Sequence, residues 1–104
     1  DFSGMDLSSA DLINANLASS YLVNTNLAHS NLSGANLSLA NLDGAKLSGA
    51  DLSWAKLDNA NLSDADLRLA FLGGAFLGGA VLLDAGLTSA DLSQAYLGRA
   101  SLID

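Results

Sequence analysis

A leucine recurs at every fifth position of this chain from Leu7 to Leu102, twenty times without an insertion. Phe2 holds the same register before them. Two residues ahead of each leucine except Leu7, which follows Met5, stands a small residue. That residue is Ala at every unit from Ala35 to Ala100, and the residue between it and the leucine is most often Asp or Asn. The chain is therefore a series of five-residue units, Ala-(Asp/Asn)-Leu-x-x, and such self-similarity is the signature of a repeat architecture.

A period of five fits neither an α-helix nor an alternating strand. A helix would rotate successive leucines by about 500°, and a strand would place them on opposite sides. A coil that turns a right angle after each unit directs every leucine toward one central axis. Four units then complete a coil of twenty residues. With coils stacked at about 4.8 Å, the 104 residues predict about five coils and a rod about 25 Å long.

The uninterrupted units resemble the pentapeptide-repeat family. That resemblance implies an all-β fold, a right-handed quadrilateral parallel β-helix (β-solenoid) of about five coils of four pentapeptides, and we expect a single domain over residues 1–104. It also implies that the leucine and the small residue before it face inward, while the other three positions face outward. Ser20, Thr25 and Ser30 take the small inward position in three consecutive units, and we expect their hydroxyls to bond to nearby carbonyls.

Composition excludes several classes of protein. The chain has no Cys, so it has no disulfide framework and no cysteine nucleophile. Its net charge of −7 argues against direct binding to nucleic acid or to an anionic membrane. No apolar run approaches the length that spans a bilayer. Because the sequence starts at Asp1 without an initiator Met, we expect an excised or processed domain.

Catalytic or metal-binding chemistry has little support in the sequence. His29 is the only histidine, with no second His or Cys to complete a metal site. The many serines lack a paired base, and a convex rod offers no cleft in which a carboxylate pKa would shift. We therefore expect no enzyme activity and no cofactor.

Residues twenty apart should stack, which wraps the chain into four faces whose five-residue stretches begin at Asp1, Asp6, Asp11 and Asn16. Their formal charges are −5, 0, −3 and +1, so two opposite faces carry the acidity. The third face holds Asp11, Asp51 and Asp91 without a cation. The candidate acidic residues on the first face are Asp43, Asp64, Asp84 and Asp104.

This acidity has two interpretations. Surface charge of one sign keeps a small domain soluble without further purpose. Alternatively, the chain is similar to the quinolone-resistance branch of the family, whose members imitate duplex DNA. That resemblance implies binding of a type II topoisomerase (gyrase) through acidic faces.

A second outward feature is apolar and concentrates in the fourth and fifth coils. An exposed aromatic patch is a plausible docking site, because such residues dominate binding hot spots. The alternative is local stabilisation by ring stacking between coils. Trp54, Tyr21 and Ile13 are interpreted as ordinary surface residues. The candidate partner-binding residues are Leu69, Phe71, Phe76, Val81, Leu83 and Tyr96.

These observations favour a non-enzymatic scaffold that presents a rod-like surface to another protein. The segments 1–8 and 27–32 resemble the repeat region of BTB-domain adaptors of cullin ubiquitin ligases. Exposed coil edges also favour end-to-end or homodimer association, or cover by flanking segments. An idealised repeat without a biological role is a third interpretation of the same regularity.

Overall fold

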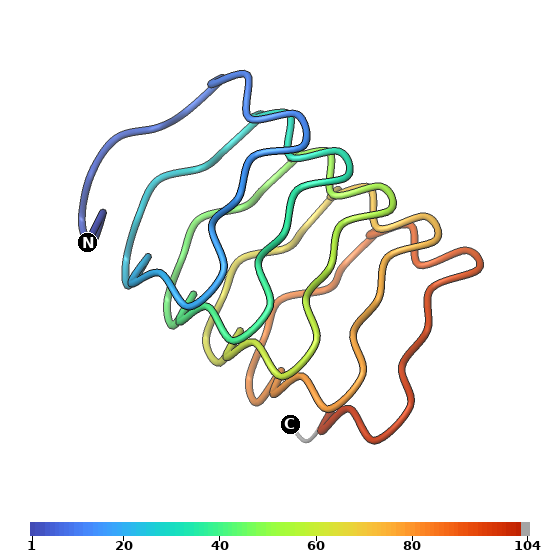
Figure 1. Ribbon diagram of the computed structural model, residues 1–104. Coiled ribbons are helices and arrows are strands. Elements are labelled where there is room, and N and C mark those ends of the chain that lie inside the picture. Colours follow the sequence, from blue (N-terminus) through green and yellow to red (C-terminus); the bar gives the residue numbers. More distant parts are fainter. Residues whose placement is uncertain (103–104) are drawn as a thin grey trace.

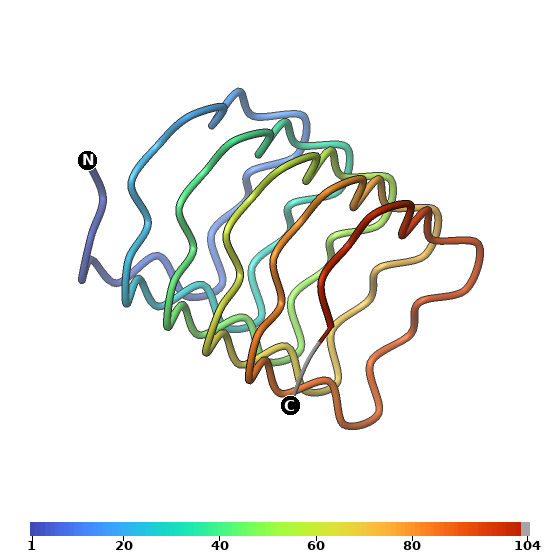
Figure 2. The same ribbon diagram turned by 90° about the horizontal axis from the view of Figure 1, so that it is seen from below.

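Successive coils of the chain stack along one axis, with the two termini at opposite ends of the stack (Figures 1 and 2). The structure is a computed structural model, and it describes residues 1–102. Within that range there is no helix and no continuous strand. Pairing consists of sixteen single-residue parallel bridges, from Asp6↔Asn26 to Val81↔Ser101, and each joins residues twenty positions apart. The predicted coil of four pentapeptides is therefore confirmed, and we number the coils 1–20, 21–40, 41–60, 61–80 and 81–100.

Backbone hydrogen bonds account for four of the five amides in each unit of the central coils. The amide of the first, small residue closes a turn onto the preceding leucine carbonyl, as in Ala55 N to Leu52 O at 3.0 Å. The amide of the second residue donates to the coil before it, and those of the leucine and the fifth residue donate to the coil after it. Each coil is thus bonded to both neighbours, which leaves few buried polar groups without a partner.

The fifth amide explains why the second position favours Asp or Asn. Each of the twelve Asp and Asn residues at this position accepts a bond through Oδ1 from the backbone N–H two residues on, as Asp51 does from Ser53 at 2.9 Å. This is the Asx-turn bond, which only a short side chain with an acceptor can make. The recurrent Asp and Asn therefore have a structural role at every coil.

Each unit ends in a corner whose fifth residue has a positive φ. All twenty residues at this position from Gly4 to Arg99 lie between 54° and 70°. A turn with a positive φ only at its third residue is of type II, which favours Gly, Asn and Asp. The sequence agrees, since no Val, Ile or Thr occupies the position. Leu39, Trp54 and Leu69 adopt this conformation despite their size.

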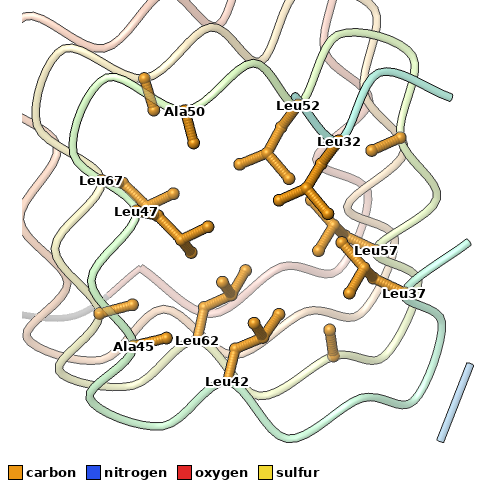
Figure 3. Packing of buried hydrophobic residues seen from close by; sticks show 14 of the residues in the cluster. Leu32, Leu37, Leu42, Ala45, Leu47, Ala50, Leu52, Leu57, Leu62 and Leu67 are labelled. Atoms are coloured by element: carbon orange, nitrogen blue, oxygen red, sulfur yellow. The ribbon is translucent and has the colours of Figure 1, made fainter. Parts of the chain in front are cut away.

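The core is a stack of leucines lined by alanines. The leucines from Leu22 to Leu77 are fully buried and Leu82 is 3% exposed. In Figure 3, labelled leucines twenty apart, such as Leu42 and Leu62, lie next to each other and point into the same interior. Burial of a leucine side chain contributes roughly 1.5–3 kcal/mol, so the column supplies most of the driving force for folding.

The three polar inward residues satisfy their hydroxyls as expected. Ser20 and Ser30 donate to the leucine carbonyls of their own turns at 2.7 Å. Thr25 donates to the carbonyl of Phe2 in the coil below at 2.8 Å. No hydroxyl is left unpaired in the interior of the described chain.

The overall dimensions differ from the expected rod. The Cα atoms span 29 × 24 × 21 Å, so the coils form a prism scarcely longer than it is wide. Five coils rise only about 25 Å at 4.8 Å each, and a twenty-residue coil is nearly as broad. The side surfaces are consequently short, and each is about five residues tall.

Leu52→Lys should unfold the protein. Leu52 is fully buried at the middle of the stack, and an unpaired ammonium there loses its hydration without gaining a partner. The loss should rival the roughly 5–15 kcal/mol by which small domains are stable. Urea denaturation beside the exposed-site control Thr88→Lys tests this, and coincident curves would contradict the inward assignment.

Asn59→Val should destabilise the protein by about 1–3 kcal/mol, because a β-branched residue is strained at positive φ. Asn59 has φ of 57° at a corner of the third coil. Asn59→Gly at the same position should stay within about 0.5 kcal/mol of the wild type. Thermal unfolding of both variants measures the difference, and equal melting temperatures would rule out a conformational cause.

Candidate partner-binding surface

The six predicted partner-binding residues lie on different faces of the prism. Phe71 pairs with Asp51 and Asp91 on the third face, whereas Phe76 pairs with Lys56 and Tyr96 on the fourth. Val81 belongs to the first face, where it pairs with Asn61 and Ser101. The structure therefore does not gather all six residues into one patch. It separates Val81 and Leu83 from the other four.

Trp54 joins the third and fourth faces. It stands at the corner between them in the third coil, and its indole leans onto Gly74 in the coil above. A Cβ built on Gly74 would lie 2.6 Å from indole atoms Cε3 and Cζ3. Gly74 is buried beneath the ring, yet 59% of Trp54 remains exposed. The indole thus occupies the corner that separates Phe71 from Phe76.

Glycines also seat the tyrosine on the fourth face. The ring of Tyr96 lies over Gly78 and Gly98, since a Cβ on Gly78 would meet Tyr96 Cε1 at 3.3 Å. Tyr96 is 60% exposed and Phe76 is 42% exposed. The glycines therefore make room for the ring itself.

The resulting surface, here called the aromatic patch, spans the third face from corner to corner and continues past Trp54 onto the fourth face. Leu69 stands at the corner that borders the third face, at 59% exposure, and Phe71 follows at 54%. Shallow hollows lie on both edges of the third face, one at Arg68 and Leu69 and the other at Trp54 and Gly73. The aromatic patch consists of Leu69, Phe71, Trp54, Phe76 and Tyr96.

Sequence reasoning treated Trp54 as an ordinary surface residue, and the structure gives it a central place. One signal in the sequence was available. Trp54 lies twenty positions before Gly74, and a large residue twenty before a glycine can lean over it. Asn14, Asn24 and His29 lean over Gly34, Gly44 and Gly49 in the same way.

The acidic residues of the first face line one corner of the prism. Asp43, Asp64 and Asp84 follow one another in the third, fourth and fifth coils at the corner between the first and second faces. Asp64 and Asp84 are exposed and hold positive φ of 55°. Asp104 lies outside the described residues. We call Asp43, Asp64 and Asp84 the acidic corner, and none of the three makes an Asx bond.

The second face carries an ion pair. Arg68 donates through Nε and Nη2 to both oxygens of Asp66, each at 2.7 Å. The hydrogen bond from Arg68 lowers the pKa of Asp66, and Asp66 raises the pKa of Arg68. The Ser8 and Ser93 hydrogen bonds lower the pKa values of Asp6 and Asp91 respectively. These carboxylates therefore stay ionised at lower pH than an unperturbed aspartate does.

The described residues show no arrangement suited to catalysis. No group of three or more His, Cys, Asp or Glu side chains is placed to hold a metal ion within residues 1–102. His29 stands at a corner with φ of 58°, against Gly49, as an outward residue. Residues 1–102 contain no helix that is long and apolar enough to cross a membrane.

Comparison with known proteins establishes the family. The family model for pentapeptide repeats matches in eight copies, over residues 20–59, 35–74, 45–82 and 72–102. The chain belongs to the pentapeptide-repeat family. A search of curated proteins found no match.

Solved structures of the family share the fold. The thylakoid-lumen pentapeptide repeat protein AT2G44920 of Arabidopsis thaliana is 31% identical, with a TM-score of 0.61 over 100% of this chain and 69% of that one. The alr5209 pentapeptide repeat protein of Nostoc PCC 7120 is 41% identical, with a TM-score of 0.53 over 82% and 62%.

A more distant structure is QnrB1, a plasmid-mediated fluoroquinolone resistance protein, in a trypsin-treated form. It is 18% identical, with a TM-score of 0.51 over 95% of this chain and 72% of that one. That likeness is one of fold alone.

The wild type should lose stability as the pH falls below about 4. Because the folded pKa values of Asp6 and Asp91 are lowered, these carboxylates stabilise the fold above the unfolded pKa of about 3.9. That contribution is lost as the pH falls through the folded pKa values. The double variant Asp6→Asn/Asp91→Asn keeps an Oδ1 acceptor and should show a smaller loss. Denaturation of both proteins at pH 7 and pH 2.5 measures the loss of stability in acid. Identical losses in the wild type and the double variant would contradict the stabilising role of the Asp6 and Asp91 carboxylates.

Proposed function

We propose that this chain is a non-enzymatic scaffold that binds a partner protein through its aromatic patch. The observation that carries the proposal is the set of large apolar side chains, Leu69, Phe71 and Trp54, all more than half exposed at adjoining positions. Aromatic side chains and Arg are the residues most enriched in binding hot spots. Two shallow hollows flank them, so a protruding side chain of a partner has somewhere to sit.

The proposal extends to features that the family leads us to expect. We take the coil to be right-handed, as the resemblance to the family implies. The general preference of parallel crossover connections for a right-handed path supports the same hand. The similarity of segments 1–8 and 27–32 to the repeat region of BTB-domain adaptors is in keeping with a scaffold. Absence of enzyme activity belongs to the proposal too, since the surface is convex and shallow.

Phe71→Ser/Phe76→Ser should leave the melting temperature nearly unchanged and weaken partner capture at least tenfold. Both rings are outward, so their loss removes contact area and leaves the core intact. The measurement is quantitative capture from lysate at graded salt, beside thermal unfolding. Tyr21→Ser serves as the control because Tyr21 is 60% exposed on the first face.

Two outcomes would contradict this proposal. Unfolding of the double variant would show that the rings stabilise the coils, as the stacking alternative holds. Equal loss of capture with Tyr21→Ser would show that any exposed aromatic residue suffices.

The second candidate function is imitation of DNA toward a type II topoisomerase. The observation that favours it is the acidic corner, since the side chains of Asp43, Asp64 and Asp84 accept none of the Asx bonds that explain other aspartates. A topoisomerase captured at low salt, released at high salt and lost with Asp64→Asn/Asp84→Asn would favour this function. Capture indifferent to that variant would exclude it.

A further inference from the structure

We propose that the third face binds an arginine-bearing segment of the partner protein, with guanidinium groups at Asp51 and Asp91 and against the Phe71 ring that lies between these two carboxylates. This inference rests on the proposed scaffold function and names the chemistry of its partner. An arginine-bearing segment is favoured because the exposed ring on the third face has a carboxylate on each side, a charge pattern that the fourth face lacks.

The charge pattern is a carboxylate on each side of an exposed ring. Phe71 forms parallel bridges to Asp51 in the coil below and to Asp91 in the coil above. The three side chains therefore project from the same column, at successive spacings of about 4.8 Å. By contrast, Phe76 on the fourth face has Lys56 below it and Tyr96 above.

Both carboxylates are held in place and remain available. Each accepts a backbone bond through Oδ1 at 2.9 Å, Asp51 from Ser53 and Asp91 from Ser93. Neither has a salt-bridge partner within residues 1–102, where Asp66 pairs with Arg68 alone. The described part of the third face contains no Lys or Arg. Oδ2 of each carboxylate is thus left to meet a cation, at an orientation fixed by its Asx bond.

The aromatic rings supply the second half of the recognition. A cation over an aromatic face is attracted by the ring quadrupole, and Arg makes this contact more often than Lys. Phe71 and Trp54 offer exposed rings at the middle and at the corner of one face. A guanidinium can stack on a ring and still donate in its own plane to carboxylates.

The amide N–H of Gly73 offers a free hydrogen-bond donor to the same segment. Because Phe71 replaces the usual Asp or Asn, no Asx bond forms in this unit, and the N–H of Gly73 has no acceptor among the described residues. It borders the hollow beside Trp54. A backbone carbonyl of the bound segment can accept from it, which would place the segment along the corner.

An extended peptide with arginines two positions apart suits this spacing. Side chains at i and i+2 share one side of a strand about 6.6 Å apart, and the flexible arginine stems cover the remaining distance to Asp51 and Asp91. The probe is therefore the peptide acetyl-Arg-Leu-Arg-amide. Its control replaces both arginines with citrulline, which has nearly the same shape without the charge.

The experiment is a titration of the isotope-labelled chain at low salt, followed by amide shifts and by fluorescence of Trp54, the only tryptophan. The arginine peptide should shift the amides of Ser53, Gly73, Gly74 and Ser93 and should alter the Trp54 emission. The citrulline peptide should shift them little. High salt should reverse the binding.

Asp51→Asn/Asp91→Asn should raise the Kd of the arginine peptide at least threefold, the scale expected for exposed ion pairs. The fold should survive, because Asn31 in the same column makes the same Asx bond at 3.0 Å. Asp64→Asn/Asp84→Asn is the matched control, with the same change in net charge at the acidic corner. It should leave the Kd unchanged.

Three results would overturn the inference. Equal weakening by the two Asp→Asn pairs would show nonspecific attraction to a polyanion. Equal binding of the citrulline peptide would show that the charge is irrelevant. Shifts of the third face that depend on protein concentration without peptide would show that a second copy of this chain occupies it. Each of these three results can occur while Phe71→Ser/Phe76→Ser still weakens partner capture. Failure of the arginine proposal is therefore distinguishable from failure of the scaffold function.

Discussion

Pairing between residues twenty apart is the constraint on which the rest of this structure depends. A single coil has no neighbour against which its leucines could be buried, and its backbone groups would face water above and below. Stacking satisfies both needs at once, since each bridge bonds two coils and brings one leucine next to another. Every side chain then has a fixed column, face and corner. The aromatic patch exists because Trp54, Phe71 and Phe76 fall on adjoining columns.

The same constraint separates structural residues from those free to serve a partner. Of eleven aspartates in the chain, six stand at the second position of the unit and make Asx bonds, which are Asp1, Asp6, Asp11, Asp51, Asp66 and Asp91. Their recurrence needs no partner to explain it. Outward aromatic residues make no Asx bond, and their packing is limited to contacts such as that of Trp54 with Gly74. In the proposed complex Asp51 and Asp91 serve both purposes, since Oδ1 of each holds a turn and neither has a salt-bridge partner among the described residues.

Much of the fold could be predicted from the leucine period alone. The twenty-residue coil, the inward leucines and the bonded hydroxyls of Ser20, Thr25 and Ser30 all follow from spacing and residue size. The grouping of the outward residues into one surface was predicted less well than the fold. Grouping the apolar residues by coil neglected the four faces, which place Val81 on the first face and Phe71 on the third. The spacing of twenty between Trp54 and Gly74 was also visible, but the indole's lean onto Gly74 depends on side-chain direction, which a count of positions does not contain.

The most direct test of this account is amide hydrogen exchange across the whole chain. Coils stacked at a register of twenty predict a five-residue period of protection in the third coil, residues 41–60. Leu52 and Ala55, whose amides bond to backbone carbonyls, should exchange slowly. The Ser53 amide, bonded only to the Asp51 side chain, should exchange faster, and the Gly73 amide should be among the fastest. Protection without this period, or equal at Gly73 and Leu72, would contradict the stacked coil and the surface built on it.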